Sequence, residues 1–311
     1  PSRMDLAEWF VDPANPLTAR VAVNRWWQQF FGVGLVKTSE DLGAQGDVPS
    51  HPELLDHLAV SFVDSGWDIK KLVKGIVMSR TYRQSSVADP GQYANDPENR
   101  LIARGARYRM DAEVIRDQIL ATSGLLVDGL HEGPSVKPPQ PDGLWKAVTM
   151  TGQRFQADGG DDILRRSVYT FWKRAMPPPQ MTILNAPIRD ACTARRERTN
   201  TPSQALLLLN EAEYFAAARH FAKETLAVPD ATPAQRLTHL YETVTSRPPD
   251  QGERATFIRL LADLKTYYEK NPALVDELTG GPETSGGGPE LAAWTVVVNT
   301  IYNLDVTKTR E

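Results

Sequence analysis

Helix start signals recur along this chain of 311 residues, and they restrict its fold more than any other sequence feature. In a capping box, a Ser or Thr before the helix and a Glu or Gln three residues later each satisfy a free backbone N–H at the helix start. The sequence offers such boxes at Ser50–Glu53, Thr201–Gln204 and Thr232–Gln235. In the last two, proline occupies the first helical position, where its missing N–H costs nothing. These signals predict a mainly α-helical chain.

Apolar residues at helical spacing follow most of these signals. Further helices are expected after Asn15-Pro16, after Asp68 and after Asp111, and Gly124 is expected to end the last of these. The β-branched and aromatic run 167–172 is the best strand candidate, and short strands are expected near 145–150. The predicted fold is therefore an irregular multi-helix domain with a long central loop and at most a few short strands.

The central segment 127–164 lacks helical periodicity and is rich in proline and glycine. It predicts a long ordered loop, and loops of this length are uncommon unless they cover or build a site. We therefore divide the chain into an N-terminal helical part at 1–126, the loop at 127–164 and a C-terminal helical part at 165–311, packed as one compact unit.

Composition excludes several function classes. A net charge of −4 and a pI near 5.8 argue against a nucleic-acid-binding protein. Cys192 is the only cysteine and the five histidines are scattered, so we expect no metal site. The absence of C-x-x-C-H excludes a covalently attached c-type haem, and we expect no cofactor in this domain. No apolar run approaches the roughly 20 residues that a membrane-spanning helix needs. Because the chain begins with Pro1 inside helical sequence, we expect it to be part of a longer protein, so a missing signal peptide says nothing about export.

Arginines are concentrated just before the capped helix at Thr201. The cluster comprises Arg189, Arg195, Arg196 and Arg198, followed by Asn200. Guanidinium groups grip carboxylate, sulfate or phosphate with two parallel hydrogen bonds, and a helix N-terminus adds positive potential. The cluster is therefore either an anion-binding site or a structural hub in which the arginines pair with buried carboxylates and loop carbonyls. We favour the hub for at least one arginine and solvent access for at least one other.

Two further features have both functional and structural interpretations. The polar stripe Arg20, Asn24, Arg25 and Gln28 falls within an aromatic helix, where it either lines a cleft or hydrogen-bonds neighbouring loops. Trp145 lies in the irregular segment, where an exposed indole can stack on a sugar ring. The other tryptophans are expected in the core.

Several strings together resemble a planctomycete domain of unknown function, the PSD-type domain. They include 15–21, 31–36, 49–55, 79–85, 195–202 and 303–305. The resemblance implies the C-terminal domain of exported planctomycete proteins, located in the periplasm or at the cell surface. Such proteins often carry a cytochrome c-like domain. The family provides no established catalytic residues to transfer to this chain.

These observations favour a non-enzymatic binding or assembly domain. Its expected partners are the cytochrome c-like domain of the same parent protein and a sulfated or acidic polysaccharide. No nucleic acid is expected as a partner. The alternative is a polysaccharide-active enzyme with a carboxylate pair in a cleft covered by residues 127–164. A purely structural spacer is the third possibility.

Overall fold

The computed structural model describes residues 2–141, 143–147, 155–279 and 288–310. In these ranges it has fifteen α-helices and a single two-stranded sheet, which confirms the predicted mainly α-helical fold. The chain divides into two compact units. Unit 1 contains residues 1–109, 192–196 and 309–311, and unit 2 contains residues 110–191 and 197–308. The first boundary therefore lies between Arg109 and Met110, and the segment 127–164 belongs wholly to unit 2. Over the described residues, no helix is both long and apolar enough to cross a membrane.

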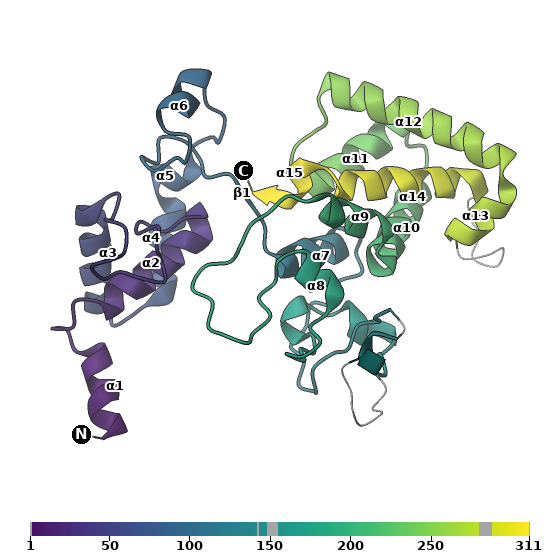
Figure 1. Ribbon diagram of the computed structural model, residues 1–311. Helices are drawn as coiled ribbons and strands as arrows, with labels where there is room; N and C mark the ends of the chain where they lie inside the picture. The colour runs from purple at the N-terminus through teal and green to yellow at the C-terminus, as the bar shows by residue number, and fades with distance from the viewer. Residues whose placement is uncertain (1, 142, 148–154, 280–287, 311) are drawn as a thin grey trace. The chain divides into compact units, whose positions relative to one another are not determined.

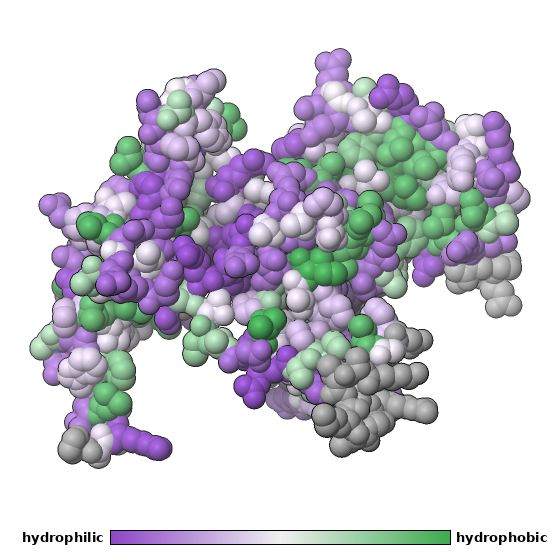
Figure 2. All heavy atoms as spheres, viewed as in Figure 1, coloured by the Kyte–Doolittle hydropathy of each residue, from purple (hydrophilic) through white to green (hydrophobic). Residues whose placement is uncertain are grey.

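Unit 1 is built mainly from short helices of the N-terminal third of the chain (Figure 1). They are α1 (Arg3–Val11), α2 (Thr18–Phe31), α3 (Pro52–Asp64), α4 (Ile69–Met78), α5 (Arg80–Arg83) and α6 (Pro90–Asn95). Helix α2 packs against α3 and α4, and the core between them includes Val23, Leu55 and Ile76. No residue of α1 is buried, and its apolar side chains lie on the molecular surface (Figure 2).

The sheet of unit 1 joins residues that are far apart in sequence. Strand β1 (Tyr108–Arg109) pairs antiparallel with β2 (Thr309–Arg310), so that Tyr108 lies opposite Arg310. Arg310 also donates to the Tyr108 hydroxyl at 3.0 Å, and its guanidinium lies 4.9 Å from the ring centre of Tyr82. The end of the chain is thereby part of unit 1.

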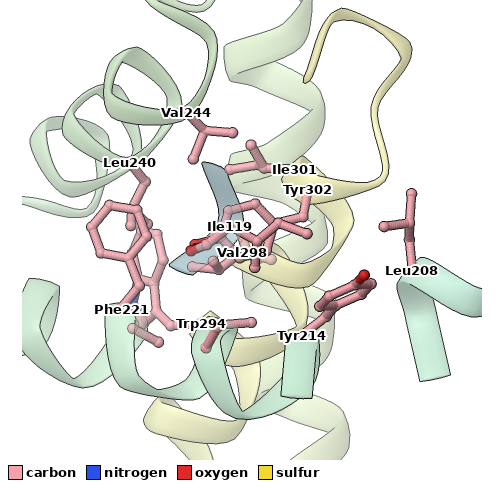
Figure 3. Packing of buried hydrophobic residues seen from close by; sticks show 14 of the residues in the cluster. Ile119, Leu208, Tyr214, Phe221, Leu240, Val244, Trp294, Val298, Ile301 and Tyr302 are labelled. Carbon is pink, nitrogen blue, oxygen red and sulfur yellow. The ribbon is translucent and has the colours of Figure 1, made fainter. Parts of the chain in front are cut away.

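Unit 2 is arranged around the apolar helix α14. Its helices are α7 (Ala112–Thr122), α8 (Pro179–Ile183), α9 (Pro202–Asn210), α10 (Ala212–Ala227), α11 (Pro233–Thr245), α12 (Gln251–Lys270), α13 (Pro272–Thr279), α14 (Gly288–Tyr302) and α15 (Asp305–Lys308). Helix α14 contacts α9, α10, α11, α12 and α13 (Figure 1). Trp294, Val298 and Tyr302 of α14 meet Tyr214 and Phe221 of α10 in the core (Figure 3). A helix that is buried nearly all round needs this continuous apolar sequence.

Three of the six predicted helix starts are confirmed. The boxes at Thr201–Gln204 and Thr232–Gln235 form with both reciprocal hydrogen bonds, and Asp68 caps α4. Gly124 follows α7 with a φ of +79°, a left-handed conformation that glycine adopts without steric cost.

Three start signals act differently from the prediction. The box at Ser50 does not form, because His51 is the N-cap residue of α3 and Pro52 begins the helix. Asp111 is the N-cap residue of α7 without a side-chain capping bond. Asn15 accepts from the backbone N–H groups of Leu17 and Thr18, so α2 begins at Thr18 and not at the proline.

The predicted strand at 167–172 is wrong. Residues Ser167–Tyr169 form a 3-10 helix, and the following Thr170 makes only an isolated parallel bridge to Val136. A ladder cannot extend along that partner segment because Pro138 and Pro139 have no N–H to donate. In the region expected to contain short strands, Leu144–Ala147 is a 3-10 helix, and residues 148–150 lie outside the described part of the chain.

Candidate functional site

The polar stripe of α2 holds a loop of unit 1. Asn24 is fully buried, and its carboxamide donates to the Val36 carbonyl at 3.0 Å and accepts from the Val36 N–H at 2.9 Å. The Gln28 side chain donates to the Ala194 carbonyl at 3.4 Å and accepts from the Ser39 hydroxyl. Both amides are occupied by the protein itself.

The two arginines of the stripe lie at the surface. Arg20 pairs with Asp56 of α3 at 2.7 Å and also donates to the Pro16 carbonyl, while Arg25 is exposed. The stripe therefore divides into two buried amides that bind backbone and two arginines that reach solvent.

The arginine cluster is divided between the two units. Arg195 and Arg196 belong to unit 1, where Arg195 pairs with Glu40 at 3.2 Å. Both side chains of that pair are about half exposed, at 47% and 49%. Arg198 belongs to unit 2 and has a buried Nε atom, and Asn200 is exposed.

Aromatic rings and cations gather in unit 2, on residues of the central segment and of the stretch that follows it. The Trp145 ring stacks on Phe155 with 4.9 Å between ring centres, and Phe171 lies 6.3 Å away in a similar orientation. The Lys173 ammonium is 4.4 Å from the Trp145 ring centre, and the Lys137 ammonium is 5.7 Å from that of Phe171. We call these five residues the aromatic–cation cluster.

A similar pair lies next to the cluster in sequence. The Arg189 guanidinium lies 4.5 Å from the ring centre of Trp172, whose indole N–H donates to the Ile188 carbonyl at 3.2 Å. All seven aromatic and cationic side chains remain partly or fully accessible to solvent. Each of the candidate residues Trp145 and Arg189 thus takes part in a contact between a cation and an indole ring, Trp145 as the indole and Arg189 as the cation.

A buried arginine braces the central segment. Arg116 of α7 is 1% exposed, and both oxygens of Glu213 accept from its guanidinium at 2.9 and 2.5 Å. The remaining N–H groups of the guanidinium donate to the carbonyls of Ile163 and Arg165 and to the Ser167 hydroxyl. Asp117 in turn accepts from the N–H and hydroxyl of Ser167. This network joins α7, α10 and the segment 163–167.

A cavity of about 240 Å³ lies beside this network. Pro138, Pro139, Ile163 and Leu164 of the central segment form part of its apolar lining. Glu211 and Glu213 supply carboxylates, and Gln180 supplies a carboxamide. Burial, together with the negative charge of nearby Glu213, raises the pKa of Glu211 above its usual value. The segment 127–164 thus contributes walls to a pocket that contains two acidic side chains.

The residues of this pocket and of the adjoining Arg116 network had weak sequence signals. Arg116 lies four residues from both Ala112 and Leu120, on the buried face of α7, and a charge at such a position signals a buried ion pair. Glu213 lies in the first turn of α10, where an acidic residue is ordinary. Gln180 follows three prolines and carried no signal.

Comparison with known proteins identifies the family to which the sequence is similar. A family model described as PSD1, protein of unknown function (DUF1553), matches residues 2–261. No curated protein and no solved structure matches the chain. The expected family is thereby confirmed.

Proposed function

Since the chain belongs to the PSD1 (DUF1553) family of proteins of unknown function, we propose that it is a non-enzymatic binding and assembly domain that recognises an acidic glycan. The supporting observation is the aromatic–cation cluster of unit 2. Sugar rings stack their C–H faces on aromatic side chains, and the sulfate or carboxylate groups of the same sugars pair with ammonium or guanidinium groups. The cluster brings both kinds of group together.

The polar residues elsewhere in the proposed sites favour binding over catalysis. Arg116 and Glu213 are bound to each other, and Asn24 and Gln28 bind loop backbone. Arg195 has an internal partner in Glu40, although both are exposed enough for an external anion to compete. Arg189, which lies over Trp172, adds a second cation–aromatic pair at residues close to the cluster in sequence.

The decisive experiment is a titration of the protein with heparin, with neutral dextran as the control polymer. Heparin is expected to bind, and the affinity is expected to fall as salt is raised from 20 to about 150 mM because exposed charges are screened. Lys173→Ala should weaken binding about tenfold, which corresponds to about 1.4 kcal/mol. Lys270→Ala removes an exposed lysine at the end of α12 and should leave the affinity unchanged. Equal binding of heparin and dextran, or equal effects of the two variants, would overturn the proposal.

The wider setting that we propose comes from the family resemblance. The domain would be exported, in the periplasm or at the cell surface, and would position a cytochrome c-like domain of the same parent protein. Purification of the full-length parent from the native membrane fraction tests this. Haem absorbance that travels with the parent supports it, and a haem-free parent confined to the cytoplasm contradicts it.

A second candidate function has one observation in its favour. Glu211 and Glu213 line a pocket that residues of the segment 127–164 help to form, and a carboxyl with a raised pKa is suited to act as a general acid. A polysaccharide-active enzyme would release reducing ends from its substrate, and Glu211→Gln would abolish that release. Absence of any release from acidic and neutral polysaccharides would leave the binding function alone.

A further inference from the structure

The lining of the pocket beside Arg116 differs from the aromatic–cation cluster in its residue types. Its walls are mostly apolar side chains, including Leu125, Pro138, Ile163 and Leu164. Its volume of about 240 Å³ would hold about eight groups of water size, at about 30 Å³ each. A single alkyl chain fits this space.

One polar side chain in the pocket lacks an internal partner. Gln180 is 4% exposed, and within the described part of the chain no group hydrogen-bonds to its carboxamide. Its polar atoms are not among the fully buried side-chain atoms without a partner, so water in the cavity reaches them. Because Gln180 lines the cavity, a ligand there can replace this water and hydrogen-bond to the carboxamide.

The charges around the pocket favour a positively charged ligand. Glu211 and Glu213 line the cavity, and Arg116, which is bound to Glu213 at 2.5 Å, offsets one of the two negative charges. Asp117 adds a further carboxylate 3.5 Å from Arg116. Two carboxylates thus lie against one guanidinium, and Glu211 is a third carboxylate, in the pocket, for which no ion pair is observed among the described residues.

We propose that this pocket binds the ammonium end of an aliphatic amine. The Glu211 carboxylate accepts from the ammonium, the Gln180 carbonyl oxygen accepts a second hydrogen bond, and the alkyl stem lies against Pro138, Ile163 and Leu164. An ammonium has three N–H donors, so two protein acceptors leave one N–H to donate to water or to another part of the ligand. Glu213 takes no direct part, because Arg116 already occupies both of its oxygens.

The same chemistry is offered by a free alkylamine and by a lysine side chain of another protein. The site is distinct from the aromatic–cation cluster, and the two share no residue. Failure of glycan binding would therefore leave this inference intact, and the reverse also holds.

Calorimetric titration of the whole chain with n-hexylamine tests the inference, with 1-hexanol as a neutral ligand of the same length. Hexylamine should bind at least tenfold more tightly than hexanol. Glu211→Gln keeps the shape of the side chain and should reduce hexylamine affinity at least tenfold, while Gln180→Leu should weaken it less. Glu224→Gln removes an exposed carboxylate from α10, the helix that Glu211 precedes, and serves as the matched control, with affinity expected to be unchanged.

The two sources of the ammonium are separated by a parallel titration with Nα-acetyl-lysine methylamide. Binding at least as tight as that of hexylamine assigns the pocket to a partner's lysine, whereas binding of hexylamine alone assigns it to a free amine. Circular dichroism of each variant checks that the fold is retained. The inference is overturned if hexylamine and hexanol bind equally, if neither amine binds, or if Glu211→Gln binds hexylamine as the unaltered protein does.

Discussion

At the scale of single residues, the buried amide of Asn24 explains the close packing of the loop that follows α2. A Cβ atom placed on Gly34 would lie 2.6 Å from both polar atoms of the Asn24 carboxamide, closer than any normal contact. Glycine is therefore needed where the loop backbone approaches Asn24. The amide in turn replaces a strand partner for Val36, whose N–H and carbonyl it binds.

Replacing Asn24 should destabilise unit 1 strongly. Asn24→Ala leaves the buried N–H and carbonyl of Val36 without partners, and each such group costs about 1–3 kcal/mol. We expect a loss of about 3 kcal/mol in the free energy of unfolding, measured by urea denaturation. Arg25→Ala changes the exposed neighbour in the same helix and should stay within about 0.5 kcal/mol of the unaltered protein. Equal losses for the two variants would show that the hydrogen bonds of Asn24 contribute little.

Arg116 is the residue on which the central segment depends most. Arg116→Met removes one partner of a buried ion pair and should cost about 3–5 kcal/mol, because Glu213 is left with an unpaired charge. The double variant with Glu213→Leu should recover part of that loss. Arg166→Met breaks the surface ion pair between Arg166 and Asp128, in which both side chains are more than half exposed. It should lower the free energy of unfolding by less than about 1 kcal/mol. Thermal melts of the three variants decide the point, and a double variant less stable than Arg116→Met would contradict the ion-pair explanation.

At the scale of elements, the local capping boxes at Thr201 and Thr232 were predicted correctly, whereas the equally local box at Ser50 did not form. Thr201 and Thr232 cap through residues three positions away, so their geometry depends on little else. The strand predicted at 167–172 was wrong because strand formation requires a partner, and the partner segment contains prolines. The pocket could not be predicted either, because it also depends on contacts between distant segments. Gln180, Glu211 and Ile163 meet only through tertiary packing, and only the contribution of the segment 127–164 to a pocket could be foreseen.

The junction between α11 and α12 provides a pH-sensitive contact. Glu253 accepts from the N-cap residue Asp250, from the Tyr241 hydroxyl and from both terminal nitrogens of Arg247. Hydrogen bonding from the Arg247 guanidinium is the main reason why the pKa of Glu253 is lowered to about 2. A carboxyl whose pKa is lower in the folded than in the unfolded state stabilises the fold above its unfolded pKa. That stability is lost as the pH falls toward the folded pKa.

Glu253→Gln should therefore lower the melting temperature most near neutral pH. The difference from the unaltered protein should remain constant down to about pH 4.5, the ordinary pKa of a glutamate, and should shrink between there and about pH 2. Glu269→Gln alters an exposed residue at the other end of α12 and should show no such trend. Scanning calorimetry at intervals of half a pH unit measures both. A difference that grows as the pH falls would contradict the sign of the effect.

At the scale of the whole molecule, the chain folds into two units that it enters and leaves repeatedly. It passes between them after Arg109, Ala191, Arg196 and Lys308. The apolar cores remain separate nonetheless, since one cluster contains residues of α2, α3 and α4 and the other contains residues of α7 to α14. Separate cores provide a basis for separate stability, because cooperative unfolding requires shared packing.

The expected result is that core variants shift different thermal transitions. Leu55→Ala opens a cavity in unit 1, and Leu240→Ala opens one in unit 2, each at a cost of about 2–5 kcal/mol. Leu55→Ala should lower one calorimetric transition and leave the other in place, and Leu240→Ala should do the reverse. Val60→Ala, at an exposed position of α3, serves as the control and should move neither transition. Unit 2 should also retain its helical signal when the transition of unit 1 is complete, because its core contains no residue of unit 1. A single transition that both core variants lower equally would show that the two cores unfold together, and the division into units would then describe geometry but not stability.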